Sequence, residues 1–359
     1  MSATNTPSSR FDNGLERARA FMAEGLCVGF VLADADEGPV LCDGLQCFSE
    51  RKLPMTPRSR FDIASVGKTM TAALAAQLVA EGWLDPDAPF TTYLPEHVLA
   101  KENCAITVRD LATHSSGFDN SKPYQSAKTQ QEFLDLLFSK RPVRPRGAAF
   151  DYACSNFIYI GKIIERLTGL DLDAAARQRL WGPLGMTSTT WYPVADDGNV
   201  VEFPFDTCGG VRRIGDHNDY ACHFSELPLG SGSVFTTIGD MRLFLSDLLH
   251  RRRFPKAYYD LLFTESYAGE SVEGGRVRRT FGWDMAAAQS DSNICPGMGF
   301  SPETIAHTGW TGITVAVDPT AGFAGAFLTN RLGGWAKYHQ AMKGRARVLE
   351  ALAGFGDES

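Results

Sequence analysis

One alanine-rich stretch, residues 64–82, constrains this chain more than any other. Ala, Leu, Met and Gln dominate it after Gly67, and Gly82 is a natural stop, so it predicts a helix buried on most sides. Ser65 and Lys68 stand three residues apart and share one face at the helix start, where backbone N–H groups lack intrahelical partners. A hydroxyl, an amine that could take its proton and N–H donors for an oxyanion would suit nucleophilic catalysis. The alternative interpretation is a core helix that holds a Ser and a Lys by chance.

Bulk composition places few limits on the function. The 359 residues, 44% hydrophobic and 21% charged, are typical of a globular protein with a large core. The net charge of −7 argues against nucleic acid or an anionic membrane as a main partner. Residues 1–8 are polar and predict a disordered tail, with neither a basic, apolar signal segment nor a membrane span. These observations predict a cytoplasmic protein.

Motifs for metals and common cofactors are absent from the sequence. The eight cysteines are scattered without a C-x-x-C pair, which favours free thiols, and no H-E-x-x-H motif indicates zinc. The sequence also lacks G-x-x-x-x-G-K-[ST], G-x-G-x-x-G and the G-x-S-x-G nucleophile elbow. We therefore expect no cofactor and no metal.

Hydrophobic spacing predicts helices and strands toward both ends of the chain. A turn at Asp318 and Pro319 separates two of the strands and indicates a hairpin. The predicted helices are 9–24, 238–250 and 335–352, and the predicted strands are 27–33, 40–48, 280–285, 304–307, 313–317 and 323–328.

The middle of the chain has a different predicted secondary structure. Residues 85–230 read mainly as helices and irregular segments, including a helix around Phe157 that Gly169 ends and a long loop from 191 to 229. The whole pattern predicts an α+β fold, with an antiparallel sheet flanked by helices. We expect a sheet domain made from residues 9–84 plus 231–355, and a mainly helical domain, 85–230, inserted into it.

Two further segments carry candidate chemistry: residues 150–157, which contain Tyr152, and residues 307–312, which begin His-Thr-Gly. Together with S-x-x-K, in this order, they resemble the serine β-lactamase and penicillin-binding-protein superfamily, which carries S-x-x-K, Y-x-N and K/H-T-G. The nearest branch holds class C β-lactamases, D-peptidases, family VIII carboxylesterases and statin-type acyltransferases. The resemblance spans residues 9–350 and implies a β-lactamase/transpeptidase-like fold. Residues 106–117, 181–186 and 230–241 match further blocks of that family.

The resemblance implies a role for each matching residue. Ser65 would be the nucleophile that forms an acyl-enzyme, and Lys68, with a pKa lowered by desolvation, would help take its proton. Tyr152 would relay that proton to the leaving group and then activate the deacylating water or alcohol. The backbone N–H groups of Ser65 and Trp310 would form the oxyanion hole. His307 would face the same cleft and donate to Tyr152 or to substrate.

Substrate contacts are implied for four more positions. Thr308 and Gly309 continue the His-Thr-Gly block, and Arg331 could supply a positive charge near the substrate, although a solvated surface arginine is an equal alternative. Cys154 stands where the family has Asn. A thiol is a poor hydrogen bonder, so Cys154 is either a weak substrate contact or a small buried filler.

Two histidines bear on the choice of function. His307 replaces the β-lactamase lysine and is largely neutral at pH 7, which weakens the β-lactamase and D-peptidase hypotheses. His114 could act as a base, but we favour a structural role for it, as we do for residues 216–219, which resemble a cleft-lining family segment.

The sequence therefore predicts a serine hydrolase that acts on a small-molecule ester, amide or thioester, most simply a carboxylesterase or amidase. An acyltransferase using the same acyl-enzyme is the nearest alternative, followed by a β-lactamase or D-peptidase. From a different class, a catalytically silent binding or sensor protein would keep the fold without the reaction, although the intact Ser65, Lys68 and Tyr152 argue against it.

Overall fold

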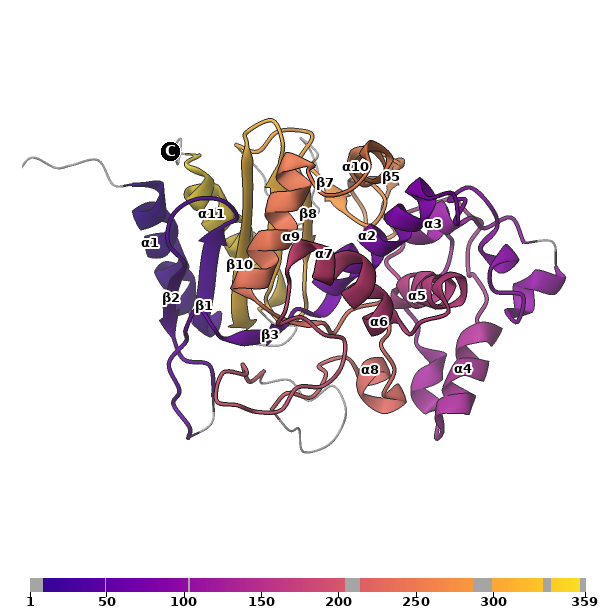
Figure 1. The fold of residues 1–359 in the computed structure, drawn as a ribbon, viewed down its shortest axis with the longest axis horizontal. Helices are drawn as coiled ribbons and strands as arrows, with labels where there is room; N and C mark the ends of the chain where they lie inside the picture. Colours follow the sequence, from indigo (N-terminus) through magenta and orange to yellow (C-terminus); the bar gives the residue numbers. More distant parts are fainter. Residues whose placement is uncertain are drawn as a thin grey trace, which may run out of the picture.

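The computed structural model describes residues 9–48, 50–102, 104–203, 214–286, 299–331 and 337–355. Within these ranges one large sheet contains strands from both ends of the chain, which are β1 (Cys27–Asp34), β2 (Leu41–Gly44), β5 (Tyr267–Glu270), β6 (Arg276–Arg279), β7 (Asp284–Met285), β8 (Ile305–Thr308), β9 (Thr314–Asp318) and β10 (Phe323–Arg331). The order is β2-β1-β10-β9-β8-β7-β6-β5, and each neighbouring pair is antiparallel (Figure 1). The chain ends meet where Leu32 of β1 lies opposite Phe327 of β10.

Helices cover both faces of this sheet, as the sequence predicts. Helices α1 (Arg10–Ala23) and α11 (Tyr338–Ala353) pack together on one face, and α9 (Ile238–His250) packs on the other (Figure 1). Along β1 successive side chains alternate between two cores. Phe30 joins the core under α1 and α11, whereas Val31 joins the larger core that includes α9. This alternation is the period of two that a strand buried on both faces requires.

The alanine-rich stretch forms the helix that the sequence predicts. A short ladder between β3 (Arg60–Asp62) and β4 (Phe235–Thr237) leads into a 3₁₀ turn, η1 (Ala64–Val66), and then into α2 (Gly67–Ala80). All residues of α2 from 67 to 78 are buried, because small alanine side chains let neighbouring elements approach from every side.

The described part of residues 85–230 is helical or irregular and contributes no strand to either sheet. Its helices α3, α4 and α5 lie to the right of the large sheet in Figure 1. Gly169 ends α5 in the left-handed conformation, as expected for a helix C-cap. The division into two domains stays a prediction. The helical elements are η2 (Phe90–Thr92), η3 (Val98–Lys101), α3 (Val108–Ala112), η4 (Pro123–Ser126), α4 (Gln130–Ser139), α5 (Cys154–Thr168), α6 (Leu172–Ala176), η5 (Arg177–Trp181), α7 (Gly182–Leu184) and α8 (Tyr220–Ser225).

Several sequence-based boundaries are wrong. The predicted loop 191–229 contains α8, and the predicted strand 280–285 is only the two-residue β7, because residues 280–283 make the turn from β6. The hairpin of β5 and β6 and the helix α10 (Lys256–Phe263) were not expected. Charged residues dominate β6, so its hydrophobic pattern is weak and its strand structure depends on pairing with neighbours.

Other expectations fall partly outside the described residues. The predicted tail 1–8 and the cysteines Cys208 and Cys295 lie there. The other six cysteines are free thiols. Among the described helices, none is long and apolar enough to cross a membrane.

Candidate active site

The turn that presents Ser65 is strained and held from several sides. Ala64, directly before it, has a φ of +46°, a conformation that side chains other than glycine rarely adopt. The buried carboxylate of Asp62 fixes this turn, since one oxygen accepts the N–H of Ala64 at 2.8 Å and the other accepts the N–H of Asn218 at 2.7 Å. Ser65 follows at the entry of α2 and lines a cavity of about 680 Å³. That volume suits a small-molecule ligand.

Lys68 lies fully buried one turn after Ser65. Its ammonium donates to the Ser65 hydroxyl oxygen at 3.1 Å, to the carbonyl of Ser231, and toward the Cys154 sulfur at 3.8 Å. Burial works to lower the pKa of Lys68, but negative charge that forms on the neighbouring Cys154 and Tyr152, together with a hydrogen bond to Tyr152, raises it, and the net direction is upward. The expectation of a lowered pKa is therefore wrong. Lys68 rests as a cation that stabilises negative charge on Ser65 rather than as a free amine.

Tyr152 completes the cluster from the segment that leads into α5. The Lys68 nitrogen lies 5.0 Å from the centroid of its ring. Burial raises the pKa of the Tyr152 phenol, and this outweighs the lowering by the Lys68 charge and by hydrogen bonds with Lys68 and Ser65. The phenol is thus protonated at neutral pH, and its hydroxyl contacts both the nucleophile and the lysine.

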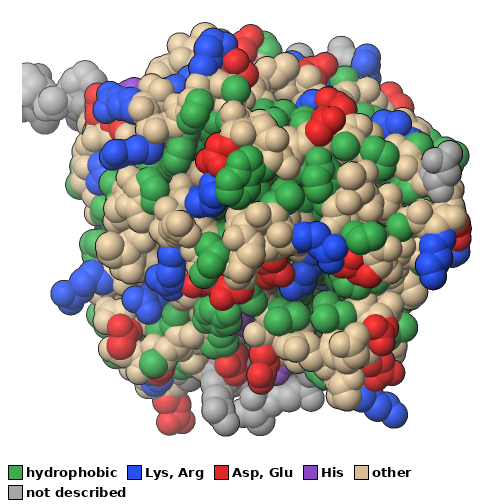
Figure 2. All heavy atoms as spheres, turned by 45° about the vertical axis from the view of Figure 1, so that its right-hand side comes forward, with side chains coloured by type: hydrophobic (Ala, Val, Ile, Leu, Met, Phe, Trp, Pro, Cys, Tyr) green, Lys and Arg blue, Asp and Glu red, His purple; other side chains and the backbone are tan. Residues whose placement is uncertain are grey.

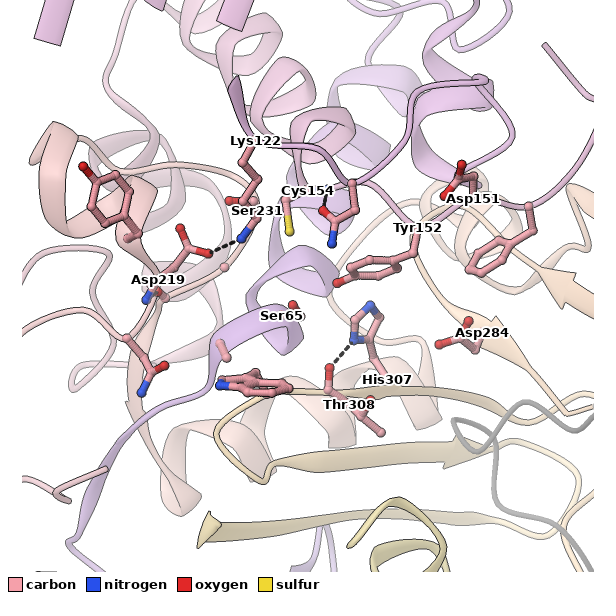
Figure 3. Close-up of a pocket in the computed structure, with 18 of the residues that line it drawn as sticks. Ser65, Lys122, Asp151, Tyr152, Cys154, Asp219, Ser231, Asp284, His307 and Thr308 are labelled. Atoms are coloured by element: carbon pink, nitrogen blue, oxygen red, sulfur yellow. Dashed lines mark hydrogen bonds and ion pairs between the residues drawn. The ribbon is translucent and has the colours of Figure 1, made fainter. Parts of the chain in front are cut away.

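His307, at 2% exposure, faces Tyr152 from β8 (Figure 3). Its Nδ1 lies 2.9 Å from the carbonyl of Thr308, so Nδ1 carries the proton and donates it. Burial and the charges of Arg279 and Lys68 hold the pKa of His307 well below its usual range. The ring is neutral, and Nε2, which has no hydrogen-bond partner among the described residues, offers a lone pair. Nε2 of His307 can therefore accept a hydrogen bond from the Tyr152 hydroxyl, whereas the sequence analysis expects His307 to donate one.

His114 also lies against Tyr152, with its ring centroid 4.5 Å from that of the tyrosine. Its Nδ1 accepts the backbone N–H of Ala153 at 3.2 Å and lies 3.1 Å from the side-chain nitrogen of Asn156. His114 has a φ of +57° and is completely buried. These contacts hold the segment that carries Tyr152, which supports the structural role expected from the sequence.

Cys154, 8% exposed, belongs to the same cluster and lines the cavity. Its backbone N–H donates to Oδ1 of Asn120 at 3.1 Å. Asn120 also lines the cavity, so an amide side chain lies beside Cys154 at this site.

The end of β8 forms the wall of the cleft that faces the Cys154 and Asn120 side. Gly309 is required there, since a Cβ atom at that position would lie 2.4 Å from the carbonyl oxygen of Ile63. Trp310 follows and lines the cavity. Arg331 donates from Nε to the Trp310 carbonyl at 2.8 Å and stacks over its ring at 4.2 Å. Arg331 is completely buried and does not line the cavity, so the expected substrate contact is wrong, and it positions Trp310 instead.

The structure therefore brings most of the predicted residues together. Ser65, Tyr152 and Trp310 line one cavity with Cys154, His307 and Thr308 (Figure 3). Lys68 donates a hydrogen bond to Ser65 from within the protein. The sequence analysis missed Asn120, Lys122 and Asp284, because no motif marks them. Asp219, also on the cavity wall, belongs to the segment 216–219 that was assigned only a structural role. No cluster of His, Cys, Asp or Glu in the described ranges could hold a metal ion.

Comparisons with known proteins agree with this geometry. A sequence model of the Beta-lactamase family matches residues 16–348. An Escherichia coli (strain K12) protein named "Putative D-alanyl-D-alanine carboxypeptidase" is 23% identical over 79% of this chain and 71% of its own length. An N-acetylmuramyl-L-alanine amidase from Bacillus subtilis (strain 168) is 27% identical over 78% of this chain and 70% of its own.

A solved structure shares the fold across nearly the whole chain. It is described as "EstCE1, a hydrolase with promiscuous acyltransferase activity", and it superposes with a TM-score of 0.76 at 20% identity, covering 97% of this chain and 98% of that one. The expected β-lactamase/transpeptidase-like fold is therefore confirmed.

Proposed function

The chain belongs to the Beta-lactamase family, and within this family of hydrolases we propose that it is a serine hydrolase that cleaves small esters or amides through an acyl-enzyme on Ser65. One observation carries the proposal. The Ser65 hydroxyl lies 3.1 Å from the buried Lys68 ammonium, and both contact Tyr152 at the edge of a cavity large enough for a small molecule.

The first half of the reaction follows from the hydrogen-bond directions. Ser65 accepts from the Lys68 ammonium, so its own proton can turn toward the Tyr152 oxygen. As the Ser65 oxygen attacks the substrate carbonyl, this proton passes to Tyr152 while the Tyr152 proton passes to the leaving atom. The Lys68 charge stabilises the anionic oxygens along this path. Backbone N–H groups of Ser65 and Trp310 would bind the carbonyl oxygen, contributing about 3–4 kcal/mol.

Deacylation runs through the same groups in reverse. Water, or an alcohol in the acyltransferase alternative, gives its proton to Tyr152 as Tyr152 returns one to Ser65. In the resting enzyme the Nε2 lone pair of His307 is the acceptor toward which the Tyr152 hydroxyl can turn, which would keep that proton on the side where the leaving group must bind.

Two observations weigh on the alternatives. His307 is neutral and cannot supply the fixed charge that the family lysine gives to a carboxylate beside the leaving group, which disfavours a β-lactamase or D-peptidase. The acyltransferase alternative uses an identical site, and the EstCE1 description favours keeping it as second candidate.

The test is covalent labelling followed by substrate comparison. A fluorophosphonate should label Ser65 in the wild type and fail to label Ser65→Ala, as read by peptide mass spectrometry. On purified protein, kcat/KM for p-nitrophenyl butyrate should exceed that for nitrocefin and for a D-Ala-D-Ala peptide by at least about tenfold, which is 1.4 kcal/mol in transition-state binding. A tenfold advantage for either of the other two substrates would overturn the esterase assignment.

A second arm addresses the acyl acceptor. Adding a primary alcohol to the ester assay should divert part of the acyl-enzyme to a new ester if the acyltransferase alternative holds. If Ser65 labels, all three substrates fail and the new ester still forms from a thioester donor, the acyltransferase assignment replaces the hydrolase.

A further inference from the structure

A second lysine, Lys122, lines the cavity from the loop before η4. Its ammonium lies 3.5 Å from Oδ2 of Asp219, and each side chain is 25% exposed. Charge-assisted hydrogen bonds usually measure about 2.7–2.9 Å, and an ammonium can donate three of them. Among the described contacts this single long one leaves Lys122 with donor capacity directed at the cavity.

Lys140, in the same part of the fold, is a lysine whose ammonium has its full set of hydrogen-bond acceptors. Its ammonium donates to the carbonyls of Asp119 at 2.7 Å and Ser121 at 2.5 Å, and it lies 3.2 Å from the Asp119 carboxylate. Three acceptors thus surround Lys140, which does not line the cavity. Within the part of the chain that the structure describes, Lys122 has one distant acceptor and lines the cavity, so its remaining donor capacity points to a ligand.

The charges around Ser65 are unequal on its two sides. Among the described residues, Asp219 is the anion that faces Lys122 and also interacts with the buried Lys68, so these three groups together carry a net charge of +1. On the other side the two buried carboxylates are neutralised, because Asp151 pairs with Arg144 and Asp284 pairs with Arg279.

This positive excess is local to the cleft. The outer face drawn in Figure 2 has basic and acidic side chains interspersed, with no large area of one sign. The charge near Lys122 is therefore not the edge of a general basic surface.

The proposed reaction fixes which part of the substrate meets Lys122. The leaving atom must lie within reach of the Tyr152 proton, on the side of Ser65 where His307 also stands. Figure 3 shows Lys122 and Asp219 on the opposite side of Ser65. The acyl chain, extending away from the leaving group, must run toward Lys122.

We propose that Lys122 binds a carboxylate at the far end of the substrate's acyl chain, so that the preferred acyl donor is a half-ester or half-amide of a dicarboxylic acid. The inference rests on the proposed acyl-enzyme chemistry and names its substrate class. The positive charge that the family carries at the His307 position is here supplied from the opposite wall of the cleft.

Asp219 tunes this contact. Its Oδ1 accepts the N–H of Ala221 at 2.8 Å as the N-cap of α8, so the carboxylate is anchored and cannot swing away when a ligand arrives. A bound carboxylate would share the ammonium with Asp219. Asp219→Ser keeps a capping oxygen and removes the competing charge, which makes it a useful variant.

The test compares two esters that have the same acyl chain and differ only in the charge at its far end. Mono-p-nitrophenyl adipate ends in a carboxylate, and p-nitrophenyl methyl adipate is its neutral counterpart. The ratio of kcat/KM, anionic over neutral, should exceed one for the wild type and fall at least about tenfold in Lys122→Gln, mainly through KM, since charge-assisted bonds are the strong ones. Lys122→Arg should keep the preference, and Asp219→Ser should raise it.

The control variant is Lys128→Gln, which removes a nearby exposed lysine that does not line the cavity and should leave the ratio unchanged. An equal ratio in wild type and Lys122→Gln would overturn the inference, as would an equal fall in Lys128→Gln. If Lys122→Gln does not fold, Lys122→Arg and Asp219→Ser provide the test. Loss of the anionic preference in Lys122→Arg, or no rise in the ratio in Asp219→Ser, would then overturn the inference.

Labelling separates this inference from the proposed function. Monomethyl adipate should slow fluorophosphonate labelling of Ser65 at lower concentration than dimethyl adipate does. If Ser65 is labelled but the two adipates slow labelling at the same concentration, the carboxylate contact is refuted and the serine hydrolase proposal is retained. Absence of both labelling and turnover would refute the two together.

Discussion

Two buried histidines lie beside Tyr152, and they carry their protons on different ring nitrogens. His114 accepts a backbone N–H at Nδ1, so its proton must be on Nε2. His307 donates from Nδ1 to a backbone carbonyl, so its Nε2 is bare. For each, burial holds the pKa well below the usual range, so both rings are neutral.

The difference shows that hydrogen-bond direction, more than burial or pKa, distinguishes the two roles. The accepting nitrogen of His114 is used up in fixing the Tyr152 segment. The accepting nitrogen of His307 stays available beside the tyrosine hydroxyl. The two histidines are thus equally buried and equally neutral, yet one has a structural role and the other is a hydrogen-bond acceptor for Tyr152.

The largest expected effect comes from removing the nucleophile Ser65 or the tyrosine beside which both histidines lie. Ser65→Ala and Tyr152→Phe should each lower kcat by about 10³-fold or more, and the double variant should lose little further, because the groups act as a unit. Steady-state kinetics with p-nitrophenyl butyrate measures this. Losses that multiply in the double variant would contradict the shared proton path.

A third histidine, remote from Tyr152, tests whether a lowered pKa alone marks function. Burial lowers the pKa of His97 to about 4. The unfolded chain takes up this proton near pH 6.5 and the folded one only near 4, so stability falls as the pH drops through that window. The loss between pH 7.5 and 4.5 should be about 2–3 kcal/mol for this group.

Urea unfolding at the two pH values measures that loss. His97→Asn keeps an acceptor for the N–H of Leu99, which Nδ1 of His97 now accepts at 3.2 Å, and it should flatten the pH dependence without changing kcat. An unchanged slope would show that other groups dominate the acid response.

Replacing each histidine beside Tyr152 should separate stability from rate. His307→Leu should lower kcat about 10- to 100-fold with little change in the urea midpoint, and His307→Gln, which keeps an acceptor, should recover part of it. His114→Asn tolerates the left-handed backbone but should cost about 1–3 kcal/mol of stability through lost hydrogen bonds.

The pH profile sharpens the same contrast. The lowered pKa of His307 places any acid limb of kcat/KM that depends on it below pH 6.5. An acid limb that persists in His307→Leu belongs to another group, and a reversal of the two phenotypes would exchange the roles of the histidines.

The smallest effect is expected at Cys154. Cys154→Ser keeps a side chain of similar size, and its hydroxyl oxygen can accept from the nearby Lys68 ammonium as the Cys154 sulfur does, so kcat/KM should change by less than about tenfold. Retained labelling of Ser65 in this variant would support the interpretation of Cys154 as a small filler beside Lys68. Loss of labelling with the fold intact would assign the thiol a chemical role.

Features that depend only on residues close together in the sequence could be predicted from it. The spacing of Ser65 and Lys68 places them on one helix face, and Gly169 ends α5, because both depend only on helix geometry. The central strands follow from their hydrophobic runs. The ordered motifs around Tyr152 and His307 then located the cleft.

Features that depend on residues distant in the chain could not be predicted. Lys122 and Asp219 meet across 97 positions, and no local pattern links them. The raised pKa of Lys68 and the tautomer of His307 depend on neighbours from other elements. The β5–β6 hairpin carries charges that mask its strand pattern, so pairing within the folded sheet decided its structure.

The pairing of β1 with β10 also has a consequence for the timing of synthesis. About three hundred residues separate these strands, and Trp310 and its support Arg331 leave the ribosome long after Ser65, Lys68 and Tyr152. A growing chain can hold its nucleophile and proton relay while the opposite wall of the cleft does not yet exist. We expect acyl transfer to begin only once the last strand has paired with β1, so enzyme activity should appear only after nearly the whole chain has been synthesised.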